Sequence, residues 1–243
     1  MSPINRAGQC FVLLWVALVL GGCVAGNSGD RSPTPALEPT PTLGPTPAVT
    51  PGPPPVSGPI DPGKYHFGRG PYTPAGFTFT MPAGWVAENG GRTVSKHPDE
   101  PGAVAFGPFV IERIYSDACA PYAVQTEVGP TVDDLVGALM AQPGPDVSEP
   151  VDITLGGYPG KRVELTVPAD LDVAACRIPA GLQIWLDASG GKYLLFDHDV
   201  TATVYIVHVN GERLVITTVF RFDSSEADIA EMEAILASIQ IEP

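Results

Sequence analysis

The sequence predicts an α+β domain in which an antiparallel β-sheet carries helices packed on its faces. Several segments alternate apolar and polar residues with the period of a strand, and two others repeat their apolar residues with the period of a helix. Short turns such as Asn210-Gly211 join neighbouring strand segments, which makes those strands antiparallel. Two helices among such hairpins favour a layered α+β domain over a parallel βαβ array.

The first 22 residues have the features of a signal peptide. Arg6 precedes an apolar run from Phe11 to Leu20. As a helix this run would rise only about 15 Å, half of the roughly 30 Å of a bilayer's hydrocarbon layer. It is therefore too short to span a membrane, and we expect residues 1–22 to be removed on export.

The end of this run, Leu20-Gly21-Gly22-Cys23, resembles the lipobox of bacterial lipoproteins. In that family the cysteine sulfur receives a diacylglyceryl group, the chain is cut before the cysteine, and the new amino group is often acylated. Two or three acyl chains hold a protein durably to a membrane. The resemblance implies that Cys23 anchors the protein to the outer side of the bacterial cell membrane; the alternative is a plain signal peptide followed by an incidental cysteine.

Residues 23–63 are dense in proline, threonine and glycine. Proline fixes φ and lacks an amide donor, so the segment favours extended polyproline II over helix or sheet. We expect a disordered tether after the lipidated cysteine that reaches on the order of 100 Å when extended. A glycosylated stalk and a ligand for proline-binding grooves are the alternatives.

Residues 64–243 then form a single globular domain. The chain's formal net charge of −14 argues against nucleic acid as a partner. With Cys10 in the signal peptide and Cys23 lipidated, Cys119 and Cys176 remain. Outside the cell two such cysteines usually pair, so a structural disulfide is expected, with a free thiol or a metal site as the alternatives.

The domain opens with a strand in which Phe77, Phe79 and Met81 alternate with threonines. Residues 103–115 suggest one long strand with a bulge or bend at Gly107-Pro108. An amphipathic helix follows, capped by Thr131 with Asp134 three residues on and ended by Pro143-Gly144. Its apolar stripe consists of Val132, Leu135, Val136, Leu139 and Met140.

Two hairpins are predicted beyond this helix. In residues 151–168 the turn comprises 156–160, with Val163, Leu165 and Val167 inward and Arg162 and Glu164 outward. A short strand covers 182–187. In residues 199–222 Asn210-Gly211 favours a type I′ turn. That turn pairs Tyr205 with Ile216, Val207 with Leu214, Ile206 with Val215, and His208 with Arg213, and the apolar residues on both faces require both faces to be covered.

The chain ends with a second helix. Ser224 or Ser225 caps it and its first turn is acidic, as the helix dipole favours. Its buried stripe consists of Ile229, Met232, Ile235, Leu236 and Ile239.

From roughly Thr73 to Ile241, these segments together resemble the Mog1/PsbP-like α/β/α sandwich domains of bacterial lipoproteins. The opening "FTFTMPAGW", the helix after "GPTVDDL", the hairpin "VDITLGGYPGKRVELTVP" and the final "ILASI" carry the resemblance. It implies an antiparallel sheet between helices, and non-enzymatic binding roles for the bacterial members. The fold's namesakes bind a small GTPase or a photosystem, but no residues here match those surfaces, so no site is carried over.

No nucleophile elbow, P-loop, zinc-protease or dinucleotide-binding motif is present, and we predict neither catalytic residues nor a cofactor. The weak exception is Asp197-His198-Asp199, which could hold a divalent ion, with Asp187 or Asp223 joining if loops converge. In an extended segment, however, the middle residue points away from its neighbours, which favours a solvated turn.

The sequence thus predicts a membrane-anchored extracytoplasmic lipoprotein with a non-catalytic binding or assembly domain. Its partner would be an unknown protein or small molecule. The alternative is an extracytoplasmic metal-binding or hydrolytic domain that uses Asp197, His198 and Asp199. A third possibility is a purely structural envelope protein without a small ligand.

Overall fold

The computed structural model describes residues 51–120, 123–176, 181–187, 192–195 and 198–243. All belong to the second of two compact units into which the chain divides, Ala48–Pro243. The expected signal peptide, Cys23 and most of the tether lie outside the described residues.

The largest sheet has nine described strands, all paired antiparallel. Eight follow one another across the sheet, and the ninth, β9, pairs with β11 beside β10. In spatial order they are β1 (Gly58–Pro59), β4 (Val86–Glu88), β5 (Thr93–Lys96), β6 (Val104–Phe109), β15 (Glu212–Arg221), β14 (Val200–Val209), β11 (Tyr158–Thr166) and β10 (Val151–Leu155), with β9 at Asp146–Val147.

Within the part of the chain that the structure describes, two smaller antiparallel sheets accompany it, which corrects the prediction of one sheet. The four-stranded sheet has the order β13 (Lys192–Leu195), β12 (Leu182–Asp187), β7 (Ile111–Tyr115) and β8 (Gln125–Glu127). The three-stranded sheet has the order β16 (Gln240–Ile241), β3 (Phe77–Met81) and β2 (Gly63–Phe67). The predicted strands at 77–81 and 182–187 therefore exist, but they pair outside the main sheet.

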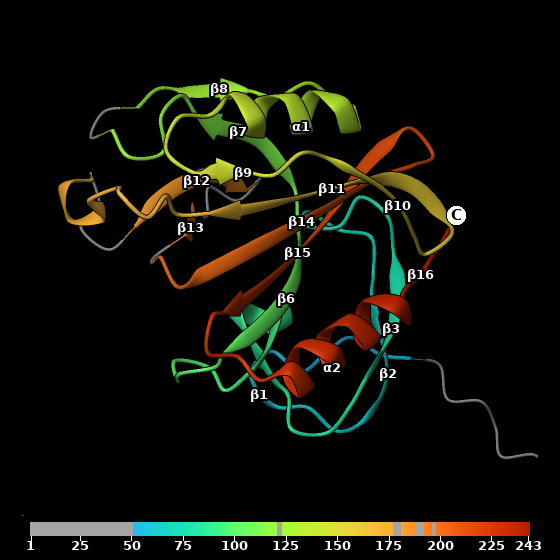
Figure 1. Cartoon of the computed structure of the whole chain (residues 1–243). Helices are drawn as coiled ribbons and strands as arrows, with labels where there is room; N and C mark the ends of the chain where they lie inside the picture. Colours follow the sequence, from blue (N-terminus) through green and yellow to red (C-terminus); the bar gives the residue numbers. More distant parts are fainter. Residues whose placement is uncertain (1–50, 121–122, 177–180, 188–191, 196–197) are drawn as a thin grey trace, which may run out of the picture. The chain divides into compact units, whose positions relative to one another are not determined.

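The two α-helices of the described residues cover opposite faces of the main sheet. Figure 1 shows α1 (Val132–Ala141) above β11 and β14, and α2 (Glu226–Ala237) below β6. Along β14 the side chains alternate, so that Ile206 packs in one hydrophobic cluster with Leu135 of α1, and Val207 packs in the other with Met232 of α2. The prediction that both faces of this hairpin are covered is confirmed.

The β14–β15 hairpin has the predicted register. Tyr205 pairs with Ile216, Val207 with Leu214, Ile206 with Val215, and His208 with Arg213. Asn210 and Gly211 both have positive φ, 51° and 93°, as a type I′ turn requires.

The β10–β11 hairpin has a tighter turn than predicted. Gly156 and Gly157 form it alone, with φ values of 56° and 91°, and Tyr158 already pairs with Leu155. Two glycines reach these positive φ values without steric cost, so the five-residue turn at 156–160 is corrected to two residues. Val163, Leu165 and Val167 are buried as predicted, and Arg162 and Glu164 are half-buried.

The predicted bulge at Gly107-Pro108 is absent from β6. The register with β15 runs through Gly107 and Pro108 without a shift, and the strand ends after Phe109. The next strand, β7, then joins a different sheet. Gly107 serves close packing instead, because a Cβ there would lie 2.7 Å from the Arg92 carbonyl oxygen.

Both helices begin as predicted. Thr131 and Asp134 form a reciprocal capping box, and Ser225 caps α2. The apolar stripe of α1 needs one correction, because Met140 is 44% exposed. It lies about 40° beyond Val136 around the helix, outside the arc that faces the sheet.

The domain begins before Lys64. Pro54 is buried, the backbone N–H of His66 donates to the Gly52 carbonyl at 2.9 Å, and β1 pairs with β4. Residues 52–63, which we expected in the tether, are therefore part of the folded unit. Two short 3₁₀ helices, η1 (Asn89–Gly91) and η2 (Val173–Ala175), complete the described elements.

Candidate functional site

A groove of about 550 Å³ opens on the main sheet, and we call it the acidic groove. Ser95, Ala105 and Val219 are cross-strand neighbours on β5, β6 and β15 and form part of its floor. Val219 packs against the hydrophobic cluster that α1 covers. The groove therefore opens on the face of the main sheet that carries α1. The remaining lining residues are Glu88, Pro98, Asp99, Glu100, Pro101, Ala103, Val104, Val200, Arg221 and Asp223.

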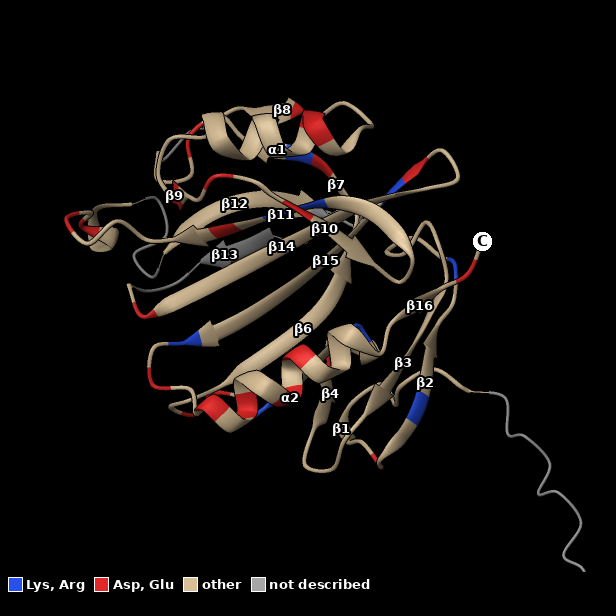
Figure 2. Cartoon of the chain, turned by 45° about the vertical axis from the view of Figure 1, so that its right-hand side comes forward, with Lys and Arg blue, Asp and Glu red and all other residues tan. Residues whose placement is uncertain are grey.

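The groove is strongly negative. Four carboxylates, those of Glu88, Asp99, Glu100 and Asp223, face one guanidinium, that of Arg221, which leaves a formal charge of −3. Figure 2 shows the basic end of β15 followed by acidic residues in the loop before α2. The side of the groove formed by this loop and residues 98–101 is therefore mainly acidic.

Arg221 is already flanked by two carboxylates. Its Nε lies 3.6 Å from Asp223 Oδ1, and its terminal nitrogen lies 3.9 Å from Asp199 Oδ2. The Asp223 carboxylate also accepts a hydrogen bond from the backbone N–H of Gly102 at 2.9 Å. These contacts hold the loop 97–103 against the end of β15.

The loop 97–103 is held in a definite shape. His97 and Asp99 have positive φ values of 56° and 60°, which are uncommon for residues with a Cβ. The hydroxyl of Ser224 donates to the Ala103 carbonyl at 3.0 Å, and the Glu100 N–H donates to the His97 carbonyl at 3.1 Å. Sparsely populated conformations persist where surrounding contacts over-determine them, so this edge of the groove is built in advance of any ligand.

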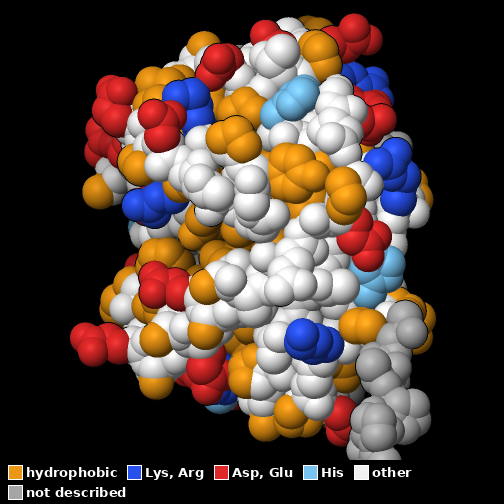
Figure 3. Space-filling view, turned by 90° about the vertical axis from the view of Figure 1, so that its right-hand side faces the viewer, with side chains coloured by type: hydrophobic (Ala, Val, Ile, Leu, Met, Phe, Trp, Pro, Cys, Tyr) orange, Lys and Arg blue, Asp and Glu red, His pale blue; other side chains and the backbone are white. Residues whose placement is uncertain are grey.

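A second groove of about 400 Å³ lies between α2 and the strands β10, β11 and β14. Its floor includes Ile153, Leu155 and Leu236, and one cation, Arg162, is balanced by one carboxylate, Glu233. Figure 3 views the side of the molecule with β10 and β16, where hydrophobic side chains gather across the middle. Tyr205 also lines this groove, and burial raises the pKa of its hydroxyl.

Comparisons with known proteins found similarity among solved structures. No protein-family model matches the chain, and no curated protein matches it. Among solved structures it is similar to LpqN, described as involved in cell envelope biogenesis of Mycobacterium tuberculosis. The sequence identity is 13% and the TM-score 0.37, over 77% of this chain and 91% of that chain.

The structure does not assemble the weak metal candidates into a site. Asp197 lies outside the described residues, and His198 is exposed in a turn. Asp199 and Asp223 both neighbour the Arg221 guanidinium, and such a cation opposes a second cation at the same place. Among the described residues no three His, Cys, Asp or Glu side chains are grouped closely enough to hold a metal ion.

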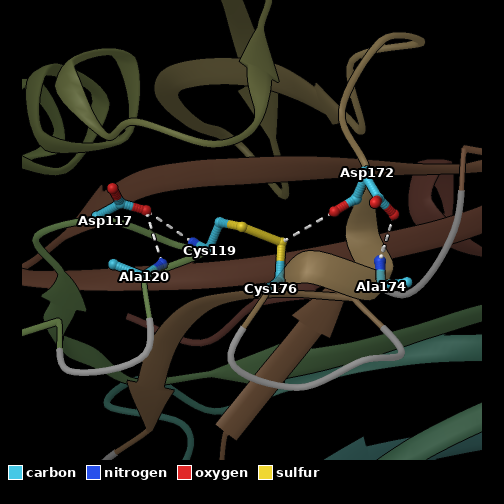
Figure 4. The surroundings of a disulfide bond; sticks show 6 residues. All are labelled: Asp117, Cys119, Ala120, Asp172, Ala174 and Cys176. Atoms are coloured by element: carbon cyan, nitrogen blue, oxygen red, sulfur yellow. Dashed lines mark hydrogen bonds between the residues drawn. A yellow bond between two sulfur atoms is a disulfide. The ribbon is translucent and has the colours of Figure 1, made fainter.

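The predicted disulfide is present between Cys119 and Cys176. Their Cα atoms lie 4.5 Å apart, and their positions differ by 57 in the sequence. Figure 4 shows that each cysteine sits in a loop organised by an aspartate. Asp117 accepts hydrogen bonds from the N–H groups of Cys119 and Ala120 at 2.8 and 2.9 Å, and Asp172 accepts one from Ala174 at 3.0 Å.

A cluster that the sequence did not predict ties β5 to α2 beneath the loop 97–103. Lys96 Nζ lies 2.6 Å from Asp228 Oδ1 and 2.9 Å from Glu231 Oε2, and the Trp85 indole N–H donates to Glu231 at 3.2 Å. Hydrogen bonds from Lys96 and from Ser225 lower the pKa of Asp228. Burial by itself lowers the pKa of Lys96, but the two carboxylates raise it overall. More than 130 residues separate Lys96 from these partners, so no local pattern could reveal the cluster.

Cys23, the predicted lipidation site, lies outside the described residues. In the described part of the chain, neither helix has the length and hydropathy needed to cross a bilayer.

Proposed function

We propose that this protein is an exported, lipid-anchored lipoprotein whose folded domain is a non-catalytic binding module. The acidic groove is the binding site. One observation carries the proposal: a groove of about 550 Å³, within the usual range of ligand sites, is bordered by a loop held in shape by Asp223 and Ser224. A preformed site avoids the entropy cost of ordering a loop on binding.

Three features support export and anchoring. The lipobox-like Leu20-Gly21-Gly22-Cys23 follows a short apolar run, and a proline-rich segment separates it from the fold. The Cys119–Cys176 disulfide fits an oxidising compartment. In this arrangement the acyl chains on Cys23 hold the protein at the membrane, and residues 24–50 act as a spacer that lifts the binding module away from the surface.

We also propose that the folded domain is a Mog1/PsbP-like α/β/α sandwich. Its support is the antiparallel sheet with α1 and α2 on opposite faces. The chain's net charge of −14 and the negative groove both disfavour a nucleic-acid partner.

Anchoring is tested by the intact mass of the protein extracted from membranes, beside a Cys23→Ala variant. We expect a mature chain that begins at Cys23 and carries added acyl groups, and a variant that lacks the acyl groups and leaves the membrane fraction. An unmodified Cys23 in a released protein would contradict the anchor.

The binding role is tested by filling the groove. Ala105 is half-buried on its floor, so Ala105→Trp places an indole in the ligand space. Wild type and variant are incubated with a cell-envelope extract and repurified, and bound molecules are identified by mass spectrometry. We expect a molecule retained by the wild type and lost from an Ala105→Trp protein that keeps its thermal midpoint. Equal retention by a folded variant would overturn the acidic groove as the binding site.

A further inference from the structure

The charge and the floor of the acidic groove indicate what kind of ligand it takes. We infer that the groove binds a small organic cation, a protonated amine carried on an apolar body. This inference rests on the proposed function, since it names the ligand class for the same site.

The carboxylates of the groove exceed its internal cations. Within the described residues no Lys or Arg lies at ion-pair distance from Glu88, Asp99 or Glu100. Glu88 accepts a hydrogen bond from the Ser95 hydroxyl, which orients its carboxylate on the floor. Because Asp199 and Asp223 flank Arg221, that guanidinium is a poor partner for an anion. The groove therefore complements a positive charge.

The rest of the groove complements an apolar body. Apolar side chains come from both the floor and the loop: Pro98, Pro101, Ala105, Val200 and Val219. Val200 is buried, and Ala105 and Val219 are half-buried. A ligand that covers these side chains gains about 25 cal/mol for each Å² of apolar surface removed from water. An amine with an aliphatic chain would place its charge beside the carboxylates and its chain against these apolar side chains.

The size of the groove favours a small molecule over a protein segment. Its volume of about 550 Å³ lies within the 300–1,000 Å³ typical of small-ligand sites. The described lining comes from one sheet face and two short loops, where carboxylates and apolar side chains are close together. This arrangement suits a compact amphiphile whose charge and apolar body occupy the same site.

Calorimetric titration of the whole chain in lipid nanodiscs tests the inference with three probes of similar shape. Hexylammonium is the cation, hexanol the neutral analogue and hexanoate the anion. Titrations with empty nanodiscs are subtracted, because each probe also enters lipid. We expect hexylammonium to bind at least about tenfold more tightly than the other two, since a charge-assisted contact contributes roughly one factor of ten. Its affinity is expected to fall as salt rises, because salt screens the carboxylates.

Two variants connect the binding to the groove. Glu88→Gln keeps the size of the side chain and an acceptor for Ser95, and Asp99→Asn with Glu100→Gln keeps the loop, because Asn tolerates the positive φ at residue 99. We expect each variant to lower the affinity for hexylammonium by about tenfold. Glu127→Gln is the matched control: Glu127 is exposed on β8, outside the groove lining, and its loss is expected to leave binding unchanged.

Several outcomes would overturn the ligand class. Equal binding of hexanol or hexanoate, or affinities that Glu88→Gln and the loop variant leave unaltered, would do so. A basic peptide as the molecule recovered from envelope extracts would also do so. In each case the Ala105→Trp comparison reports separately whether the groove is a binding site, so failure of the ligand class is distinguishable from failure of the proposed function.

Discussion

The disulfide between Cys119 and Cys176 joins two loops beside the hydrophobic cluster that α1 covers. Cys176 is buried there and Cys119 packs at its edge. The bond joins cysteines at a sequence separation of 57. In the chain-entropy view it stabilises the fold by restricting the unfolded chain, by roughly 4 kcal/mol for a loop of this size.

We therefore expect reduction of the disulfide, or the double change Cys119→Ser and Cys176→Ser, to lower the unfolding free energy by about 4 kcal/mol. Urea unfolding with and without reductant measures this. The double variant is the control, because reductant should not shift its midpoint further. Equal stability of oxidised and reduced wild type would contradict a structural role.

The shifted pKa of Asp228 makes the free energy of unfolding depend on pH in the acid range. Its pKa is lower in the folded state than in the unfolded chain, first because Lys96 hydrogen-bonds to its carboxylate and then because Ser225 does. The stabilisation is therefore complete above the unfolded pKa, near 4, and is lost as the pH falls through the lower folded-state value.

Asp228→Asn removes the ion pair with Lys96 and is expected to lower stability by about 2 kcal/mol at pH 7. The difference from wild type should shrink as the pH falls below about 4, since the wild-type carboxyl then becomes neutral too. Chemical unfolding between pH 7 and 3 measures it. A difference that stays constant with pH would mean that Asp228 acts through packing alone.

At the scale of elements, the space around two glycines shows that a side chain would fit at one of them and clash at the other. Gly137 is exposed in the middle of α1, and a Cβ there would meet no atom within 4 Å. Gly160 lies in β11, where a Cβ would come within 2.1 Å of the Ile206 carbonyl oxygen on β14. Gly137 therefore only weakens α1, whereas Gly160 allows β11 and β14 to pack closely.

We expect Gly137→Ala to stabilise the protein by about 0.5–1 kcal/mol, because alanine is the better helix former. Gly160→Ala is expected to destabilise it by more than about 2 kcal/mol, because backbone must shift. Thermal and urea unfolding of both variants give the comparison. Similar effects of the two changes would contradict the close approach of β11 and β14.

Comparison of single elements shows which structural features a local sequence pattern can predict. The capping box of α1 and the Asn210-Gly211 turn were predictable because their contacts join residues within a few positions. The break between β6 and β7 was not, since it depends on which sheet each strand joins. Met140 was misplaced because an apolar stripe does not reveal how wide an arc the sheet covers.

At the scale of the whole molecule, two hydrophobic clusters share the strands β14 and β15. Trp85 is buried in the cluster beneath α2 and Trp185 in the cluster beneath α1. Alternate residues of the same strands enter each cluster, so loss of one removes the support of the other.

This arrangement predicts a single unfolding transition. We expect Trp185→Phe, in which Trp85 reports unfolding, and Trp85→Phe, in which Trp185 does, each to show a fluorescence midpoint in urea that coincides with its own midpoint by circular dichroism. Leu135→Ala in α1 and Met232→Ala in α2 should each lower the free energy of unfolding by about 2–5 kcal/mol. Each change should lower the urea midpoint whichever tryptophan reports it. In either variant, a fluorescence midpoint that departs from the circular-dichroism midpoint would show that the clusters unfold independently.

The α+β class, both helices with their N-caps, the register of the β14–β15 hairpin and the cysteine pair could all be predicted from the sequence. Each depends on periodicity, turn chemistry or elimination among four cysteines, which act locally or by composition. The division of the described strands into three sheets, the Lys96–Asp228 pair and the acidic groove became visible with the folded structure. These join residues as distant as Glu88 and Asp223, and chain folding alone determines which distant residues meet.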